Sequence, residues 1–186
     1  MKHLNWCKIA RPKQITPKGD WNVWLILAGR GWGKTRTGAQ DIAFYGLTRP
    51  NSRIAIVAPT HRDGRDTCIE GISGLLSCFD RELIENWNRS IGELTLKNGT
   101  IYRTFSAEQP DRLRGPQFHR AWCDELGAWK NDEAWDQLLF GLRLGENPQI
   151  VVTTTPKPTD IIKELVSSKD SLVTRGSTFE NKDNLA

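Results

Sequence analysis

The sequence predicts an α/β fold in which a mainly parallel sheet is flanked by helices. Three short apolar segments, at residues 22–28, 53–59 and 149–156, are bounded by turn residues and rich in branched side chains, as buried strands are. Segments with helical patterning lie between them, and this alternation is typical of a parallel sheet covered on both faces. The 186 residues, 38% of them hydrophobic, suffice for one core, so we expect a single domain over residues 1–186.

The remaining elements follow in a regular order. Shorter strands are expected at residues 120–123 and 171–177. Helices are predicted at residues 35–47, 63–79, 132–144 and 159–167. In residues 92–106, Asn98-Gly99 stands between two alternating runs, which predicts a tight turn and a small antiparallel hairpin.

Composition and charge exclude several classes of protein. The net charge of +4 and the pI near 9.0 are a mild basic excess that suits contact with phosphate backbones. The four cysteines form no CxxC pair and have no histidine at metal spacing, so we expect neither a zinc site nor a disulfide framework, and a reducing cytoplasm. Without a signal-like start or a run of about 18 apolar residues, no membrane partner is expected.

A glycine-rich loop follows the first predicted strand directly and runs into the first predicted helix. Its sequence, at residues 28–35, is AGRGWGKT. Glycines let the backbone wrap closely around a phosphate, and the helix N-terminus adds partial positive charge. Lys34 would reach the β- and γ-phosphates of a nucleotide, and the Thr35 hydroxyl would be a ligand of Mg²⁺. The sequence therefore predicts a phosphate-binding loop, a P-loop.

One position departs from the GxxxxGK[ST] pattern, because Ala28 stands where the first glycine is expected. A methyl group there restricts the turn only modestly. The Trp32 side chain either covers the nucleotide or packs inside the protein. We assign ATP contacts in this segment to Gly29, Arg30, Gly31, Trp32, Gly33, Lys34, Thr35 and Arg36.

Two acidic residues end the strand expected at 120–123. Asp124 and Glu125 follow it at the carboxyl edge, where open α/β sheets place their ligands. Asp124 would hold Mg²⁺ through water, and Glu125 would orient and deprotonate an attacking water. Two solvated acids at a strand end are the alternative interpretation.

Hydroxyl and guanidinium groups stand at two further points near this edge. Thr153, Thr154 and Thr155 end a predicted strand, where they can sense a γ-phosphate, although threonines also simply favour strands. Arg112 and Arg114 lie in a turn-rich loop before the acidic pair, where a guanidinium could stabilise a transferring phosphoryl group or merely be solvated.

Four motifs together resemble the N-terminal ATPase domain of the large terminases of tailed bacteriophages: AGRGWGKT, IVAPT, AWCDE and VVTTTP, in this order. The upstream segment, ARPKQITPKGDWNVWL, is similar to the adenine-side Q motif of that family, in which Gln14 would hydrogen-bond the base. The resemblance implies a P-loop NTPase fold of the ASCE/RecA-like class.

The resemblance also implies an activity and partners. It implies an Mg-dependent ATPase that forms a homo-oligomeric ring on a prohead and translocates double-stranded DNA in the host bacterial cytoplasm. Its partners would be the portal protein and the small terminase subunit. Lys34 and Glu125 would be catalytic, and Arg114 matches the position of an arginine finger supplied to the neighbouring subunit. The threonine triplet matches a coupling motif, and from it we assign Thr155 to the nucleotide.

Other interpretations stay open at this point. Large terminases continue into an RNase H-like nuclease domain, for which nothing after Thr178 has room, so we expect a truncated chain without nuclease activity. The end, FENKDNLA, is expected to stop without a capping element. A helicase-like DNA translocase shares the phosphate loop and the acidic pair. A nucleotide-binding but inactive prophage remnant is the third possibility, motivated by Ala28 and the abrupt end.

Overall fold

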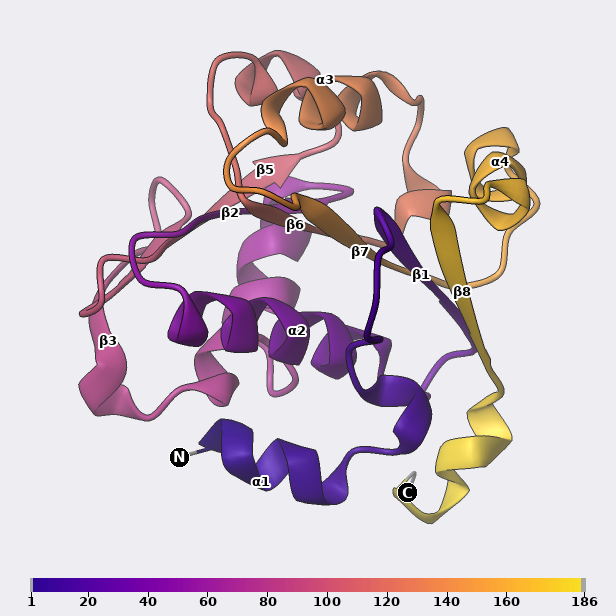
Figure 1. The fold of residues 1–186 in the computed structure, drawn as a ribbon, viewed down its shortest axis with the longest axis horizontal. Helices are drawn as coiled ribbons and strands as arrows, with labels where there is room; N and C mark the ends of the chain where they lie inside the picture. The colour runs from indigo at the N-terminus through magenta and orange to yellow at the C-terminus, as the bar shows by residue number, and fades with distance from the viewer. Residues whose placement is uncertain (1, 185–186) are drawn as a thin grey trace.

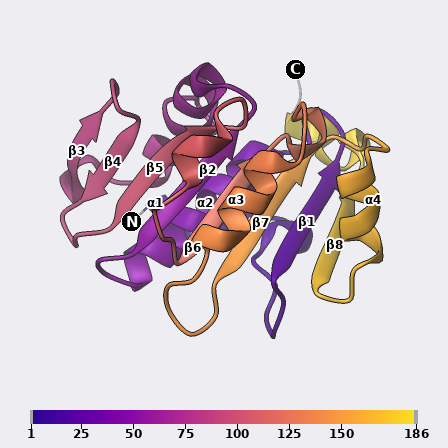
Figure 2. The same ribbon diagram turned by 90° about the horizontal axis from the view of Figure 1, so that it is seen from above.

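The chain forms one mixed sheet with helices on both faces. The structure is a computed structural model that describes residues 2–184. The sheet has eight strands in the order β3-β4-β5-β2-β6-β7-β1-β8, with β3 and β8 at opposite edges (Figure 2). The strands are β1 (Val23–Ala28), β2 (Arg53–Ala58), β3 (Ile84–Asn88), β4 (Glu93–Leu96), β5 (Ile101–Ser106), β6 (Arg120–Asp124), β7 (Gln149–Thr154) and β8 (Ser171–Gly176).

Two pairs of helices cover the sheet. Figure 1 shows α1 (Lys2–Ile9) and α2 (Lys34–Thr48) on one face, and α3 (Glu133–Gly141) and α4 (Asp160–Ser167) on the other. No helix in the described part of the chain is long and apolar enough to cross a bilayer.

Alternate residues of the strands enter two separate cores. In β1, Trp24 and Ile26 pack with α2, while Leu25 and Leu27 pack with α3 and α4. Because both faces are buried, the strand is apolar at every position, as the sequence indicated. All pairings among β5, β2, β6, β7, β1 and β8 are parallel. The predicted α/β fold with a mainly parallel sheet is confirmed.

The helix predicted at residues 63–79 is wrong. The structure has instead a short π-helical turn, η2 (Asp63–Ile69), and a separate 3-10 turn, η3 (Leu75–Cys78). Gly71 and Gly74 lie between the two turns, and the amide of Gly74 bonds to the carbonyl of Gly71, which reverses the chain. Glycine has a low helix propensity, so apolar periodicity across these positions does not make one helix.

The predicted hairpin is confirmed and is larger than expected. β4 and β5 pair antiparallel around Asn98-Gly99, where Gly99 has a φ of 83°. β3 adds a third antiparallel strand at the sheet edge. β3 was not predicted, because its residues, IENWN, show no apolar alternation and are largely exposed.

The last elements agree with the prediction in part. α3 is shorter than the helix expected at residues 132–144, because Leu142 leaves the helix and forms a bridge with Phe118. α4 and β8 form where they were expected. After β8, however, residues 178–184 form 3-10 turns, η7 (Thr178–Asn184), which pack beside the glycine-rich loop. The expectation for Leu185 and Ala186 lies outside the described residues.

A buried ion pair fixes α2 against the start of β6. Arg120 donates from Nε to Asp41 Oδ2 at 2.9 Å and from Nη2 to Asp41 Oδ1 at 2.7 Å. Both side chains are at most 5% exposed. The guanidinium also lies over the rings of Trp21 and Tyr45, at 4.9 and 5.2 Å. Such a two-bond, stacked geometry offsets the cost of removing both charges from water.

Removing one partner of this pair should destabilise the protein strongly. We expect Arg120→Met to lower the free energy of unfolding by about 3 to 5 kcal/mol, because Asp41 is left as a buried, unpaired charge. The double variant Arg120→Met with Asp41→Leu should regain most of this loss. Urea unfolding followed by circular dichroism measures both. A double variant no more stable than Arg120→Met would show that the charge of Asp41 is not the cause.

Candidate active site

The glycine-rich loop of residues 29–33 joins β1 to α2, as predicted. Gly31 and Gly33 have φ values of 75° and 97°, in the left-handed region that favours glycine. α2 begins at Lys34, so the unbonded amides of its first turn face the loop. Strand, left-handed loop and helix N-terminus together form a cradle for an anion.

Ala28 does not disturb this loop. It is the last residue of β1, fully buried, and it pairs with Gly176 of β8. The backbone at this position is extended, and the left-handed turns come only at Gly31 and Gly33. The departure from the glycine pattern therefore falls where any small residue fits.

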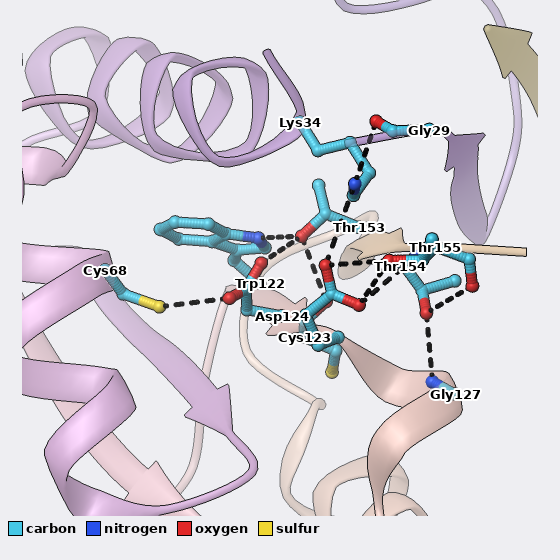
Figure 3. A network of polar contacts seen from close by, with 11 residues as sticks. Gly29, Lys34, Cys68, Trp122, Cys123, Asp124, Gly127, Thr153, Thr154 and Thr155 are labelled. Carbon is cyan, nitrogen blue, oxygen red and sulfur yellow. Dashed lines mark hydrogen bonds and ion pairs between the residues drawn. The ribbon is translucent and has the colours of Figure 1, made fainter. Parts of the chain in front are cut away.

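The loop and the acidic pair meet at one edge of the sheet. Lys34 Nζ donates to the Gly29 carbonyl at 3.2 Å (Figure 3). The same nitrogen lies 3.7 Å from Glu125 Oε1. The Lys34 side chain is only 8% exposed. This contact joins a residue after β1 to a residue after β6, and it places the acids toward the phosphate cradle.

Glu125 has a strained backbone. Its φ of 47° and ψ of 46° are left-handed, which is uncommon for a residue with a side chain. The carboxylate accepts bonds from the Thr155 amide at 3.2 Å and from the Thr155 hydroxyl at 3.0 Å. The left-handed backbone directs the carboxylate toward Lys34, and the two donors of Thr155 hold it there.

Asp124 is buried, and two donors hold it. The Thr153 hydroxyl donates to Oδ1 at 2.7 Å, and the Cys68 thiol points to Oδ2 at 3.7 Å. Trp122 Nε1 donates to the Thr153 oxygen at 2.7 Å, which directs the hydroxyl proton to Asp124. Burial raises the pKa of Asp124 to about 6, although the bond from Thr153 opposes the shift.

The three threonines divide their contacts between the acids and a neighbouring turn. Thr153 contacts Asp124, and Thr155 contacts Glu125, while Thr154 accepts a bond from the Gly127 amide at 3.1 Å. Thr153 and Thr154 end β7, and Thr153 and Thr155 bond to the acids, whereas the predicted sensing of a γ-phosphate stays a prediction. The predicted contact of Thr155 with a nucleotide stays a prediction.

Gln14 lies beside Gly33 of the loop, and its predicted bond to a base stays a prediction. Its side chain is 7% exposed and donates from Nε2 to the Thr37 hydroxyl at 3.2 Å. The Arg11 amide donates to Gln14 Oε1 at 3.1 Å. Each end of the amide has further bonding capacity for a base, because an amide nitrogen carries two protons and the oxygen two lone pairs.

Two of the expected nucleotide contacts point elsewhere in the structure. The Trp32 ring is fully buried between Arg11 and the end of β8, so it packs inside the protein and does not cover a nucleotide. Only its backbone remains at the cradle. The Arg36 guanidinium contacts the Ser77 hydroxyl of η3, which directs it away from the loop.

The other predicted residues are placed as follows. Thr35 is half-buried in the first turn of α2, and Arg30 is exposed in the loop. Arg114 is 59% exposed and contacts Asp111 at 3.3 Å and Glu133 at 3.7 Å, neither of which belongs to the cradle. The described contacts therefore do not bring Arg114 to the loop of its own chain.

The arrangement can bind and activate a nucleoside triphosphate. Loop amides and Lys34 are donors for phosphate oxygens. The Asp124 carboxylate and the Thr35 hydroxyl are oxygen groups of the kind that Mg²⁺ prefers as ligands. Cys68 is a site residue that the sequence analysis missed. A lone cysteine gives no sequence signal for a contact 56 residues away.

The sequence matches one family model. Residues 25–169 match the family described as "Terminase large subunit, T4likevirus-type, N-terminal". No curated protein sequence matches the chain.

Solved structures of the same kind share the fold. The Thermus phage P74-26 large terminase ATPase domain superposes with a TM-score of 0.73 at 16% identity, over 90% of this chain and 80% of that one. The large terminase of a thermophilic bacteriophage, in complex with ADP, gives 0.71 at 16% identity, over 100% and 46%. The HK97 bacteriophage large terminase gives 0.68 at 20% identity, over 86% and 36%. The chain thus spans less than half of the latter two proteins.

The burial of Asp124 has a consequence for stability. Because the folded pKa of about 6 exceeds the ordinary 3.8, the folded protein binds this proton more tightly than the unfolded chain does. Stability therefore falls as pH rises from about 4 to about 6. We expect Asp124→Asn to raise the free energy of unfolding by about 1 to 3 kcal/mol at a pH of about 8, without metal or nucleotide.

The higher free energy of unfolding of Asp124→Asn should disappear near a pH of about 4, where the Asp124 carboxyl of the wild-type protein is protonated in the folded state. Urea unfolding at both pH values, in the presence of a chelator, measures the difference. An equal gain at both values would mean that the ionised carboxylate is not the source of the instability.

Proposed function

This chain belongs to the terminase large-subunit family, as an N-terminal domain of the T4likevirus type, and we propose that it is the ATPase motor domain that drives double-stranded DNA into a prohead. The family that the four sequence motifs indicated is thereby confirmed. The observation that carries the proposal is the contact between Lys34 and Glu125, because it joins the phosphate loop to the acid that would activate water.

The proposed hydrolysis uses groups already in place. ATP would lie with its β- and γ-phosphates on the loop amides and on Lys34 Nζ, which leaves its contact with Gly29 to do so. Thr35 and Asp124 would hold Mg²⁺, which would neutralise charge on the phosphate oxygens. Glu125 would accept the proton of the attacking water, and its carboxylate lies 3.7 Å from Lys34 Nζ, beside the phosphate-binding loop.

Neighbouring groups support the same assignment. The Thr153 hydroxyl holds Asp124 and the Thr155 hydroxyl holds Glu125, so β7 and the residue that directly follows it contact both acids. A change at the γ-phosphate that moves either acid would therefore reach β7 directly, which is what a coupling motif requires. Gln14 stands beside Gly33 and would bond to the adenine base.

The partners belong to the proposal as well. Arg114 is exposed and turned to Asp111 and Glu133, which suits a finger given to the neighbouring subunit of a homo-oligomeric ring. The ring would sit on the portal protein in the host bacterial cytoplasm and receive DNA with the small terminase subunit. We propose no nuclease activity for residues 1–186.

The two other functions have less support. A helicase-like translocase would share the loop and the acids, but the family match over residues 25–169 favours the terminase. An inactive remnant would tolerate decay of the site. Here the loop glycines, Lys34 and both acids keep a complete arrangement, and Ala28 fits within β1.

Hydrolysis should depend on Lys34 and Glu125. We expect Lys34→Ala and Glu125→Gln each to lower Mg-dependent ATP turnover by about 100-fold or more, because one removes the phosphate contact and the other the proton acceptor. Release of inorganic phosphate at saturating ATP, with and without Mg²⁺, measures this. Glu125→Gln should still bind ATP, since the phosphate loop is intact.

Lys163→Ala is the matched control for Lys34→Ala. Lys163 is an exposed lysine of α4 that pairs only with Asp160 among the described contacts. Full turnover in both site variants would defeat the proposed function. Tight ATP binding without turnover in the wild-type chain, even at high protein concentration with DNA, would favour the inactive module.

Arg114 should act between subunits. We expect Arg114→Ala to lower turnover by about 100-fold or more, and a mixture of Arg114→Ala and Lys34→Ala proteins to regain activity. In the mixture, a subunit with an intact loop can receive Arg114 from a neighbour whose own loop is disabled. Phosphate release at rising total protein concentration measures this complementation.

Arg112→Ala is the control, because Arg112 lies two residues away in the same exposed region and should leave turnover within about twofold. A mixture that stays inactive at every ratio and concentration would refute an arginine supplied in trans.

A further inference from the structure

Three segments far apart in the sequence meet on the outer side of the phosphate loop. β8 pairs with β1, and the Gly29 amide bonds to the Gly176 carbonyl at 3.2 Å, so η7 begins beside the loop. The segment before β1 that contains Arg11 and Lys13 approaches from the same side, beside the yellow η7 in Figure 1. The loop thus has a support that comes from both ends of the described chain.

Two linked side chains hold consecutive carbonyls of the loop. Asn181 donates from Nδ2 to the Gly31 carbonyl at 2.6 Å. Arg11 donates from Nη2 to the Trp32 carbonyl. Arg11 also donates from Nη1 to Asn181 Oδ1 at 2.6 Å and to the Glu180 carbonyl at 3.1 Å. The two side chains therefore act on the loop as one unit.

Holding these carbonyls fixes the direction of two amides. In a trans peptide the C=O and the following N–H point in opposite directions. The Gly31 carbonyl shares its peptide with the Trp32 amide, and the Trp32 carbonyl shares its peptide with the Gly33 amide. With both carbonyls bonded on the outer side, both amides point inward. The Trp32 amide donates to the Gly29 carbonyl at 3.4 Å, and Lys34 Nζ donates to the same oxygen, so both donors point to the inner side of the loop.

The Glu180 carboxylate holds η7 against the phosphate loop and against the segment that contains Lys13. Its Oε1 accepts from Lys13 Nζ at 3.1 Å and from the Ser177 amide at 3.0 Å, and its Oε2 accepts from Trp32 Nε1 at 3.3 Å. The Ser177 amide, Lys13 and Trp32 lower the pKa of Glu180 to about 2. The Arg11 guanidinium lies 5.0 Å from the centre of the Trp32 ring, so the ring is held on two sides.

We propose that Arg11 and Asn181 are positioning residues that preset the Trp32 and Gly33 amides of the phosphate loop for a nucleotide phosphate. This inference rests on the proposed function, because it assigns the loop to ATP. Neither residue touches the nucleotide. Each acts through a backbone carbonyl, and the two together remove the need to reorient two peptides on binding.

Loss of the preset amides should weaken nucleotide binding more than it slows hydrolysis. Preset amides contact a phosphate equally in the bound substrate and during reaction, so their loss weakens binding more than it slows chemistry. We expect Asn181→Asp to raise the Kd for Mg·ADP and the KM for ATP by about three- to tenfold, the effect of one lost hydrogen bond. The kcat at saturating ATP should fall by less than about twofold.

The variants separate the two bonds of Asn181. Asp keeps the oxygen that Arg11 contacts but has no proton for the Gly31 carbonyl, whereas Asn181→Ala loses both bonds and should have the larger effect. Arg11→Lys keeps the charge but cannot reach several acceptors with one planar group. Asn86→Ala, at an exposed position of β3, is the matched control and should leave Kd and KM within about twofold.

Amide hydrogen exchange in the nucleotide-free protein gives a second readout. It distinguishes a local change at the loop from a general loss of stability in the variant. Exchange at Trp32 and Gly33 should accelerate in Asn181→Asp while the strands keep their protection. Unchanged Kd, KM and exchange in Asn181→Asp would overturn the inference, and so would kcat and KM that change by equal factors. A wild-type chain that binds no Mg·ADP would instead overturn the proposed function, and the inference with it.

Discussion

Parallel pairing of β6, β7 and β1 brings the chemistry of three distant segments to one edge of the sheet. Each strand ends there, so the loop after β1, the acids after β6 and the threonines of β7 become neighbours. β7 lies between the other two strands, and for this reason Thr153 near its end bonds to Asp124, Thr155 just after it bonds to Glu125, and Lys34 reaches Glu125. The strand order, more than any single contact, decides which side chains meet.

The site holds arrangements that are unfavourable in isolation. Asp124 is a buried carboxyl with a raised pKa, and Glu125 has a left-handed backbone. Both persist because neighbours bond to them, Thr153 and Cys68 to the first and Thr155 to the second. A carboxylate that is costly to bury is one that gains most from a cation, so the burial that raises the pKa of Asp124 also suits it to the Mg²⁺ role proposed for it.

Local signals predicted most of the fold, and contacts across the chain account for what was missed. The phosphate loop, the buried strands and the turn at Asn98-Gly99 each have a pattern contained in a few residues. The helical pattern at residues 63–79 was misleading because glycines interrupt it, and β3 had no pattern because it is an exposed edge strand. The roles proposed for Cys68 and Asn181 depend on a contact with a residue at least 56 positions away, which a single sequence does not encode in any readable pattern.

A tryptophan inside a phosphate loop has a clear physical reason in this fold. The ring of Trp32 occupies the space beside Gly176 so closely that no side chain fits there, and Arg11 stacks on it. The loop is therefore anchored by its own side chain to the junction of β8 and η7. Asn181 grips the same loop from η7, so displacement of η7 must move either the Gly31 carbonyl or the Trp32 ring. The conformation of the loop and the position of η7 are therefore coupled, although the residues that couple them, Arg11 and Asn181, lie far apart in the sequence.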